Sequence, residues 1–388
     1  MLTFKRFTGI NNVLPAHRLT RSDLVRAQDV DAGLSGEIER RQGYAEVSTA
    51  CHKNLWQAEG FMLATEGSHL TAIFPGGARV VLDHGMGPGR VWYCNLPDGR
   101  TTYTDGLRHG VTDGTAGLGR SIPAPASLGS PDDTFGALFP GDYRYHLTYV
   151  RLTDHLEGPA ASSHPVALSQ GGLRLDGLPT LAGHALNIYL SGQDGEGAYL
   201  AGTTADDWFE FAGNDTQMAL PCRTLGATEF PVGTFTAFWR GRVLTAVGAT
   251  LWASRPVSTH LGDWKDFKQL TAPITAIVPV NDGIYVGTTT GLVFLAGETW
   301  DSLQYNDTAH GAVVPGSGIQ VPGHQIKLGE GVGRGPAMMC IAGGEIVAGF
   351  GDGQTVSLTD GKYKTSAAEV CATFREIRGI PQYIALPQ

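Results

Sequence analysis

Carboxylates stand close together in two short stretches of the chain, and they are the first residues to consider for chemistry. The stretch TDHLEGP (153–159) contains Asp154 and Glu157, and GQDGEG (192–197) contains Asp194 and Glu196. Such groups could bind Ca²⁺ or form the carboxylate pair of a glycosidase. Both stretches lie where turns between strands are expected, and turn formation alone explains acidic residues there. We therefore predict two turns, with no metal or catalytic site.

Other catalytic and ligand-binding patterns are missing from the sequence. There is no GxSxG or HExxH, and GEGVGRGP (329–336) fails the phosphate-loop patterns because Pro336 stands where a helix would have to begin. The cysteines lie far apart without a CxxC pair, so we expect buried thiols rather than zinc ligands or disulfides. They are Cys51, Cys94, Cys222, Cys340 and Cys371. We predict a protein that is not an enzyme and needs no cofactor.

Four tryptophans, Trp239, Trp252, Trp264 and Trp300, lie in the second half of the chain. Indole rings could stack on sugars in a lectin-like groove. Large aromatic rings also fill the space between packed sheets, which is their more common use. We expect these four rings to belong to the core.

A pair of arginines, Arg40 and Arg41, lies in SGEIERRQGYAEV (35–47) and could contact phosphate. The formal net charge is −9, however, so the surface as a whole repels phosphate, and a dedicated DNA-binding protein is disfavoured. We predict that Ile38 to Val47 form a strand that pairs with the last sheet and closes a ring of sheets. The two side chains would then project from the rim, either as a contact for another protein or as a solvated pair without a role.

The elements that must position these residues are β-strands. The chain contains 54 Gly and 21 Pro between short runs of strand-forming residues. Hairpins with a Gly-containing turn are predicted at 60–73, 241–254, 282–298 and 343–361, with a weaker copy at 91–111. Units of about four strands, recurring at this spacing, indicate the blades of a β-propeller. We predict an all-β fold with a small propeller of about five blades.

The repeats are interrupted once. Residues 121–141 contain several prolines and are interpreted as an extended linker. In the stretch that follows, Tyr143, Tyr145 and Tyr149 alternate with polar residues, which predicts a strand. This strand and the further short strands after it predict an inserted β-sandwich of the immunoglobulin or fibronectin III type.

The first 50 residues fit neither pattern. Thr20 could cap a short helix from Leu24 to Ala27, and the rest is interpreted as an arm that lies across other surfaces. The predicted division is an N-terminal arm with the ring-closing strand (1–50), the first part of the propeller (51–125), the linker and sandwich (126–220) and the second part of the propeller (221–388).

No stretch of the sequence predicts a membrane segment. The longest apolar runs are far shorter than the roughly 18 residues that would cross a bilayer. The opening residues MLTFKRFTGINN lack the apolar core of a signal peptide. We expect a soluble protein without membrane insertion.

The order of the segments resembles bacteriophage virion proteins of the tail nozzle, or tail tubular, type. The resemblance is carried by FTGINNVLPAHRL (7–19), AQDVDAGLSGEIERRQGY (27–44), YRYHLTYVRLTDHLEGPAASS (143–163) and GLPTLAGHALNIYLSG (177–192). It implies a propeller ring at the head-to-tail interface of the virion, whose channel DNA passes through without sequence-specific binding. It implies no catalytic residues. It also implies contacts with the portal or head-tail adaptor and with tail fibre or tail-tip proteins, and a homo-oligomer for which six copies are expected.

Five residues are expected to make contacts between subunits or with partners. Phe7, Asn11 and Asn12 belong to the F-x-G-x-N-N pattern of the resemblance, and Arg40 and Arg41 lie on the predicted rim. A second class of function stays open, namely a propeller that binds or hydrolyses glycans of the host surface. A nozzle subunit should copurify with virions, whereas a lectin or hydrolase should act as a discrete soluble particle.

Overall fold

The computed structural model describes residues 6–33, 35–41, 43, 45–46, 48–328, 331–377 and 379–388. The fold is nearly all β, with 48% of residues in strands and 2% in helices, and it contains many small antiparallel sheets. The helical residues lie in three short 3₁₀ turns, η1 (Ala16–Arg18), η2 (Asp215–Gln217) and η3 (Gly323–Gln325). In the described part of the chain, no helix is long and apolar enough to cross a membrane.

Five antiparallel sheets follow one another along the described chain, and each is made mostly of strands adjacent in sequence. The first contains β5 (Lys53–Gln57), β6 (Met62–Glu66), β7 (His69–Ile73) and β8 (Arg79–His84), and the second contains β9 (Trp92–Asn95), β10 (Thr101–Thr104), β11 (His109–Thr112) and β12 (Gly117–Gly119). The third contains β22 (Thr228–Glu229), β23 (Thr234–Trp239), β24 (Arg242–Val247), β25 (Thr250–Ser254) and β26 (Leu261–Gln269). The fourth contains β27 (Ile274–Val280), β28 (Gly283–Thr288), β29 (Leu292–Ala296) and β30 (Gln304–Asp307), and the fifth contains β31 (Ile319–Pro322), β34 (Pro336–Ala342), β35 (Glu345–Gly349) and β36 (Thr355–Ser357).

The predicted hairpins are confirmed in these sheets. β6 pairs with β7, β24 with β25, β28 with β29 and β35 with β36, while β9, β10 and β11 form the weaker copy. Gly67 and Gly248 turn the first two hairpins with φ of +62° and +61°, a conformation that only Gly adopts without strain.

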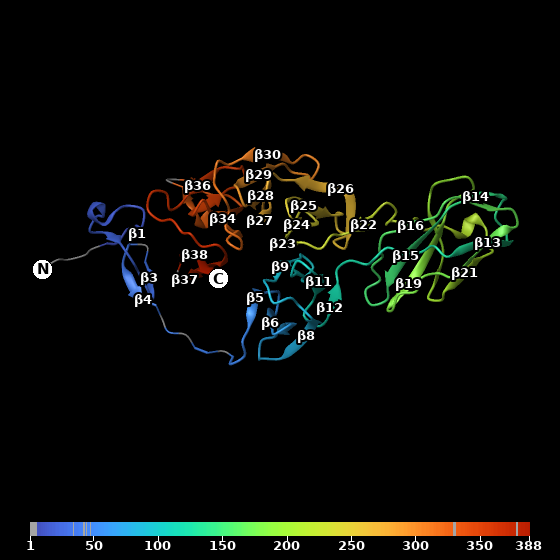
Figure 1. The fold of residues 1–388 in the computed structure, drawn as a ribbon, viewed down its shortest axis with the longest axis horizontal. Coiled ribbons are helices and arrows are strands. Elements are labelled where there is room, and N and C mark those ends of the chain that lie inside the picture. The colour runs from blue at the N-terminus through green and yellow to red at the C-terminus, as the bar shows by residue number, and fades with distance from the viewer. Residues whose placement is uncertain are drawn as a thin grey trace.

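The five sheets lie in an arc, each packed against the next (Figure 1). Separate apolar clusters fill the spaces between neighbours. One joins the first and second sheets around Leu63 and Tyr103, and the next joins the second and third around Val111 and Val243. Further clusters join the third to the fourth sheet and the fourth to the fifth. Since each sheet buries its face only against its neighbours, the arc depends on contacts between consecutive sheets.

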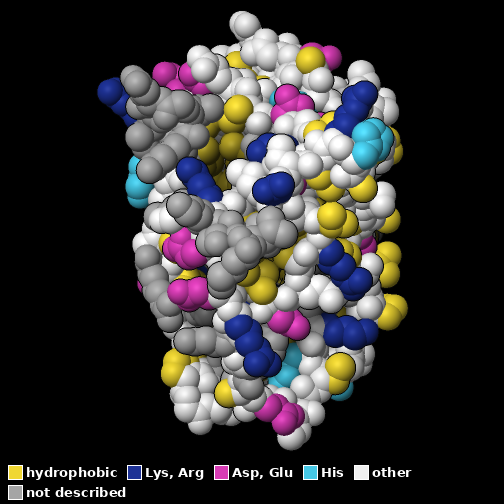
Figure 2. Space-filling model, turned by 90° about the vertical axis from the view of Figure 1, so that its left-hand side faces the viewer, with side chains coloured by type: hydrophobic (Ala, Val, Ile, Leu, Met, Phe, Trp, Pro, Cys, Tyr) yellow, Lys and Arg dark blue, Asp and Glu magenta, His cyan; other side chains and the backbone are white. Residues whose placement is uncertain are grey.

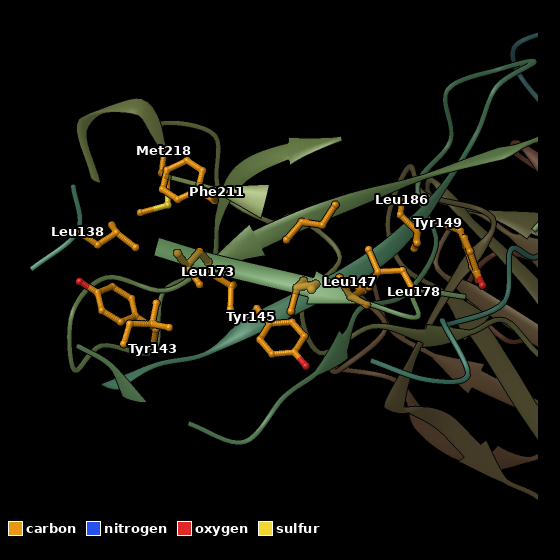
Figure 3. Packing of buried hydrophobic residues seen from close by; sticks show 14 of the residues in the cluster. Leu138, Tyr143, Tyr145, Leu147, Tyr149, Leu173, Leu178, Leu186, Phe211 and Met218 are labelled. Atoms are coloured by element: carbon orange, nitrogen blue, oxygen red, sulfur yellow. The ribbon is translucent and has the colours of Figure 1, made fainter. Parts of the chain in front are cut away.

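A unit of nine strands is inserted between the second and third sheets. Its strands are β13 (Ser130–Phe135), β14 (Gly141–Tyr143), β15 (Tyr145–Arg151), β16 (Ala161–Ser162), β17 (Val166–Leu168), β18 (Gly171–Asp176), β19 (His184–Leu190), β20 (Tyr199–Thr204) and β21 (Trp208–Phe211). They form the sheets β13-β18-β21 and β16-β15-β19-β20 and the pair β14-β17. Buried side chains from these strands, among them Tyr145, Leu147 and Leu173, meet in one core (Figure 3).

The expected linker at 121–141 is wrong in part, because β13 lies inside it. β13 pairs along its whole length with β18 and forms an edge of its sheet. Pro131 is tolerated there because an edge strand has one side on which backbone N–H groups need no strand partner.

The described residues from 6 to 40 form a small unit of two-stranded pairs at the end of the molecule opposite the inserted unit (Figure 1). β1 (Gly9–Ile10) pairs in parallel with β2 (Asp23–Leu24), and β3 (Val30–Ala32) pairs with β4 (Ile38–Arg40). The predicted ring-closing strand from Ile38 to Val47 is therefore wrong, because β4 ends at Arg40 and pairs locally with β3. A short hairpin costs less chain entropy than a contact with the far end of the chain. Residues 42, 44 and 47 of that prediction lie outside the described residues.

The predicted helix after Thr20 is also wrong, although the predicted capping contact forms. The Asp23 carboxylate accepts hydrogen bonds from the Thr20 N–H and hydroxyl, both at 2.9 Å. The backbone carbonyls of Ser22 and Leu24 then accept from Thr8 and Asn11. Because β1 takes up these carbonyls, the segment continues as a strand.

The chain ends in a long hairpin of β37 (Val370–Ile377) and β38 (Ile380–Pro387), while β32 (Lys327–Leu328) and β33 (Gly331–Val332) form a short pair before β34. The N–H groups of Val370 and Ala372 point away from β38 and donate to the carbonyls of Pro315 and Gly316. In an antiparallel ladder, residues directly opposite each other point their N–H groups the same way, either toward each other or away. Pro387, opposite Val370, therefore directs its nitrogen toward the outer edge of β38. Pro381, opposite Glu376, does the same. The missing N–H groups of these prolines blunt that edge against further strand pairing.

Candidate functional site

Of the residues expected to contact partners, Asn11 and Asn12 serve the chain's own fold. Asn11 is 4% exposed, and its side-chain oxygen accepts hydrogen bonds from the backbone N–H groups of Val13 and Leu14. The Asn12 amide exchanges two hydrogen bonds with the backbone of Lys364, at 2.7 and 2.9 Å. The Asn12 N–H also donates to the carbonyl of Lys362. Asn12 thus fastens the N-terminal unit to the segment between β36 and β37.

Phe7, Arg40 and Arg41 lie on the same unit in different surroundings. Phe7 is half-buried, and its N–H donates to the carbonyl of Gly36. Arg41 forms an ion pair with Asp31 at 3.2 Å, and Asp31 also lies 3.8 Å from Arg375 on the C-terminal hairpin. Arg40 is exposed. Of the two arginines, Arg40 presents its side chain to solvent while Arg41 takes part in an internal contact.

The face that carries this unit is mixed in character (Figure 2). Among the residues that Figure 2 colours by type, Lys and Arg side chains are spread between acidic and hydrophobic ones and form no continuous basic stripe. Such a surface suits contact with another protein better than with the regular phosphate charges of a duplex.

The four acidic residues considered for chemistry are held in turns and ion pairs. Asp194 accepts the N–H of Asp142 at 3.0 Å, as expected for a turn residue, and its own φ is +51°. Asp154 binds the Arg151 guanidinium through two contacts of 2.9 and 2.6 Å. Burial pushes the pKa of Asp154 up, but hydrogen bonds and charge from Arg151 outweigh it, and the net shift is downward. Glu196 is exposed.

Glu157 fastens a loop to the sheet beneath it. One of its carboxylate oxygens accepts hydrogen bonds from the Thr148 hydroxyl at 2.5 Å, the Tyr189 hydroxyl at 2.6 Å and the Asn187 amide at 3.2 Å. Burial, and then the hydrogen bond to this carboxylate, raise the pKa of Tyr189. All three donors lie on β15 and β19. Three donors on one oxygen make Glu157 an anchor of the loop between β15 and β16.

The joint between the inserted unit and the arc is built on the same loop. His260, at the start of β26, hydrogen-bonds the backbone carbonyl of Glu157 at 2.9 Å. Arg151, which is buried, donates from its guanidinium to the carbonyl of Gly119 in β12 at 2.5 Å. A side chain on Gly158 would collide with Ile122. This joint was not predicted from the sequence, where its one signal was the Glu-Gly-Pro segment at 157–159.

A buried group of polar side chains lies close to this joint, between the second and third sheets. The Arg120 side chain is 2% exposed, lies 4.2 Å over the Phe230 ring, and has two nitrogens without a hydrogen-bond partner among the described residues. Burial lowers the pKa of Arg120 to about 9. Burial also raises the pKa of Cys94 to about 12 and, aided by the charge of Arg120, lowers the pKa of His109 to about 3. Both the thiol and the imidazole are therefore neutral at pH 7, and the thiol is a poor nucleophile.

The tryptophan expectation is correct for two residues. Trp239 and Trp300 are each 4% exposed and belong to the core between the third and fourth sheets. Trp252 is half-buried and packs against Phe267 at 5.3 Å. Trp264 is 72% exposed, so its assignment to the core is wrong. It lies between Gly262 and Phe267 of β26, where the pairing with β25 shifts in register, so the regular alternation of buried and exposed side chains is interrupted there.

As expected, the cysteines form no disulfide in the described chain. The expectation that all five are buried is wrong in part. All five cysteines are free; Cys340 is buried, whereas Cys51 and Cys371 are exposed. Among the described residues, no group of three or more His, Cys, Asp or Glu is placed to hold a metal ion. A hollow of about 480 Å³ near β31 and β34 has His324 as its one ionisable lining residue.

Comparisons with known proteins give little further guidance. No protein-family model matches the chain, and no curated protein matches it. Among solved structures, the chain is similar to PorZ, a bacterial surface component of the type-IX secretion system of Porphyromonas gingivalis, with 11% identity, 86% of this chain and 51% of that chain covered, and a TM-score of 0.21. It is also similar to the extracellular domain of the one-component system BT4673 of B. thetaiotaomicron, with 8% identity, coverage of 85% and 44%, and a TM-score of 0.17. The chain spans about half the length of these structures, and at such TM-scores neither likeness bears on function.

Proposed function

We propose that this protein is a structural, non-enzymatic subunit of a bacteriophage virion, of the tail nozzle type. In this proposal the five sheets are the blades of a β-propeller, and the inserted unit is a β-sandwich of the immunoglobulin or fibronectin III type. The observation that carries the proposal is the order of parts along the chain. An N-terminal unit, two sheets, an inserted unit and three further sheets follow one another as in the family that the sequence resembles.

The packing of the sheets supports a mechanical role. Apolar clusters join each sheet to the next, and the last one extends from the fifth sheet to Phe374 and Tyr383 of the C-terminal hairpin. The loop before β9 reaches the same hairpin, because Arg90 forms an ion pair with Glu369 at 3.2 Å and donates to the carbonyl of Val370. This contact ties the beginning of the arc to its end across 280 residues. Many long-range contacts of this kind resist deformation of the ring.

The surface charge suits a conduit for DNA. The net charge is −9 and the residues outside 126–220 are balanced in charge, so no part of the chain has the excess of basic side chains that would hold passing DNA. The expected partners are the portal or head-tail adaptor on one side and tail fibre or tail-tip proteins on the other. The expected assembly is a homo-oligomeric ring of six copies, and the expected location is the virion, at the interface between head and tail.

A protein inventory of purified virions tests this function. The proposal expects peptides of this chain at several copies per particle, retained after washing in high salt. A protein found only in the host lysate, and not in particles that infect normally, would contradict it.

One observation favours the alternative, a glycan-binding propeller. On β26, Trp264 is 72% exposed and Phe267 is 43% exposed, and flat exposed aromatic rings on a rigid sheet suit stacking on sugars. The alternative expects Trp264→Ala to abolish binding of the purified protein to glycans of the host surface. The nozzle proposal expects no glycan binding in either protein.

A further inference from the structure

The charge of this protein is concentrated in one part of the chain. Residues 126–220 contain 12 Asp and Glu but only three Arg, which gives a net charge of −9, equal to that of the whole chain. The remaining residues are balanced, with 25 basic and 25 acidic side chains. Two of the three arginines are already used, since Arg151 pairs with Asp154 and Arg174 pairs with Asp176. The inserted unit is thus a strongly acidic body on an otherwise neutral molecule.

The end of this unit that lies farthest from the arc also exposes aromatic rings. Phe135, at the end of β13, is 84% exposed and Phe139 is 68% exposed, while Leu138 between them is buried in the core (Figure 3). Two contacts hold the loop that carries them. The Phe139 carbonyl accepts the Tyr143 hydroxyl at 2.8 Å, and the Pro140 carbonyl accepts the Gln193 amide at 2.8 Å. A loop fixed in this way presents its rings at little cost in conformational entropy on binding.

Acidic side chains lie near the loop that carries these rings. Asp142 is exposed in β14, three residues after Phe139, and the turn with Asp194 is hydrogen-bonded to it. Asp215 is exposed and lies near Tyr143, because its charge and that of Asp194 both help to raise the pKa of Tyr143 after burial. We call the surface formed by Phe135, Phe139, Asp142, Asp194 and Asp215 the distal tip.

The opposite end of the molecule carries complementary side chains. In the N-terminal unit, Arg18, Arg21, Arg26 and Arg40 are exposed, and none of them forms an ion pair with a described residue. Arg21 and Arg26 flank Val25, which is 72% exposed. This end therefore combines an exposed aliphatic side chain with guanidinium groups that form no ion pair with a described residue, while the distal tip combines exposed rings with exposed carboxylates.

We propose that the distal tip of one copy docks on the N-terminal unit of the next copy, so that the protein assembles head to tail. A contact between two different surfaces at opposite ends (Figure 1) produces a ring when the rotation closes. Buried rings supply the affinity, and the opposite charges fix which surfaces meet and speed their encounter. This inference rests on the proposed ring and names the surfaces that would form it.

Sedimentation velocity of the full-length protein tests the contact. At low ionic strength, where charges act over roughly 30 Å, the wild-type protein should sediment as species larger than a monomer. Asp142→Lys with Asp215→Lys should weaken this association at least about tenfold, and Phe135→Ser with Phe139→Ser should weaken it as well. A wild-type protein that stays monomeric at every concentration would overturn the inference.

A matched control separates the distal tip from the overall charge. Asp206→Lys with Asp207→Lys makes the same change in charge on exposed residues of the turn between β20 and β21, away from the tip. Leu178, whose N–H donates to the Asp207 carbonyl, lies at the other end of the core from Leu138 (Figure 3). This variant should associate like the wild type. Equal losses in the two double variants would mean that total charge, and not the tip, controls association.

A charge exchange provides the most specific outcome. Arg21→Glu with Arg26→Glu should abolish association on the other side of the contact. An equimolar mixture with the Asp142→Lys, Asp215→Lys variant should associate again, because both contacts between unlike variants join opposite charges. The acidic tip of one variant meets the unchanged arginines of the other, and the lysine-bearing tip meets the acidic N-terminal unit. Failure of the mixture to associate would overturn the head-to-tail contact. The two proposals can fail separately. If the protein is monomeric but present in virions, only the head-to-tail contact is refuted. If it self-associates but is absent from virions, only the proposed function is refuted.

Discussion

Removing the Asp154 carboxylate should destabilise the protein more than any change on its surface. Arg151, its partner, has only 8% of its side chain exposed, and Asp154 has 20%. After Asp154→Ala, the guanidinium keeps the carbonyl of Gly119 as a hydrogen-bond acceptor but loses both contacts to a negative charge. Leaving one buried charge without its partner costs about 3–5 kcal/mol. We expect a loss of this size in the free energy of unfolding.

Urea denaturation followed by circular dichroism and by tryptophan fluorescence measures this loss. The transition that reports on the inserted unit should move to lower urea, because the pair holds the loop that joins the unit to β12. The double variant Arg151→Met, Asp154→Leu should be close to the wild type, since replacing both buried charges by apolar groups is often neutral.

The pH dependence provides an independent check on the same pair. The pKa of Asp154 is lower in the folded protein than in the unfolded chain. Its contribution is therefore present above the unfolded pKa, about 4, and is lost as the pH falls through the folded pKa. If Asp154→Ala costs less than about 1 kcal/mol, as for an exposed ion pair, the joint is not buried as described and the reasoning fails.

Three further changes test other parts of the structure. The folded-state pKa of His109 is lowered to about 3, so the unfolded chain takes up a proton at higher pH than the folded protein does. This histidine should therefore destabilise the fold by about 2 kcal/mol at pH 5 relative to pH 7. His109→Gln should make the pH dependence of thermal unfolding shallower, and an unchanged slope would show that the imidazole is not buried. Asn12→Ala should loosen the N-terminal unit by about 1–2 kcal/mol, seen as faster hydrogen exchange around Lys364, and unaltered exchange there would remove Asn12 from its anchoring role. Arg40→Glu with Arg41→Glu should change unfolding by no more than ~1 kcal/mol and should leave a weak affinity for duplex DNA unchanged; tight DNA binding that disappears in this variant would make the arginine pair a nucleic-acid site.

The sequence predicted the parts of the fold that are set by local chemistry. The hairpins at 60–73 and 241–254 were found because Gly67 and Gly248 stand where the turn requires positive φ. The strand from Tyr145 to Arg151 was found because its tyrosines alternate with polar residues. In each case the residues that determine the structure lie within a few positions of one another.

The errors arose where distant segments decide the outcome. Asn12 is anchored by a backbone group 352 residues later in the chain, and His260 bonds a carbonyl 103 residues before it. Neither pairing has a local signal. The strand at Ile38 was correctly placed but given the wrong partner, because nearby β3 was not recognised as a strand. Pro131 concealed β13, since proline is compatible with an edge strand but breaks the usual strand pattern.

The five residues expected to contact partners were chosen from sequence motifs, and their role in contacts stays a prediction. Arg40 is exposed as expected, whereas Asn11 and Asn12 serve internal contacts that a motif cannot distinguish from contacts with a partner. The distal tip was missed because Phe135 and Phe139 lie in the stretch interpreted as a linker. Their exposure depends on the orientation of a fixed loop, which the sequence pattern does not specify.

Electron cryomicroscopy of the head-to-tail junction of purified virions tests the proposed ring. We expect a ring of copies of this chain around the DNA channel, into which the arc of five sheets and the inserted unit can be fitted, with each acidic inserted unit against the N-terminal unit of its neighbour. A junction filled by other proteins, with no density that fits this chain, would contradict the proposed function.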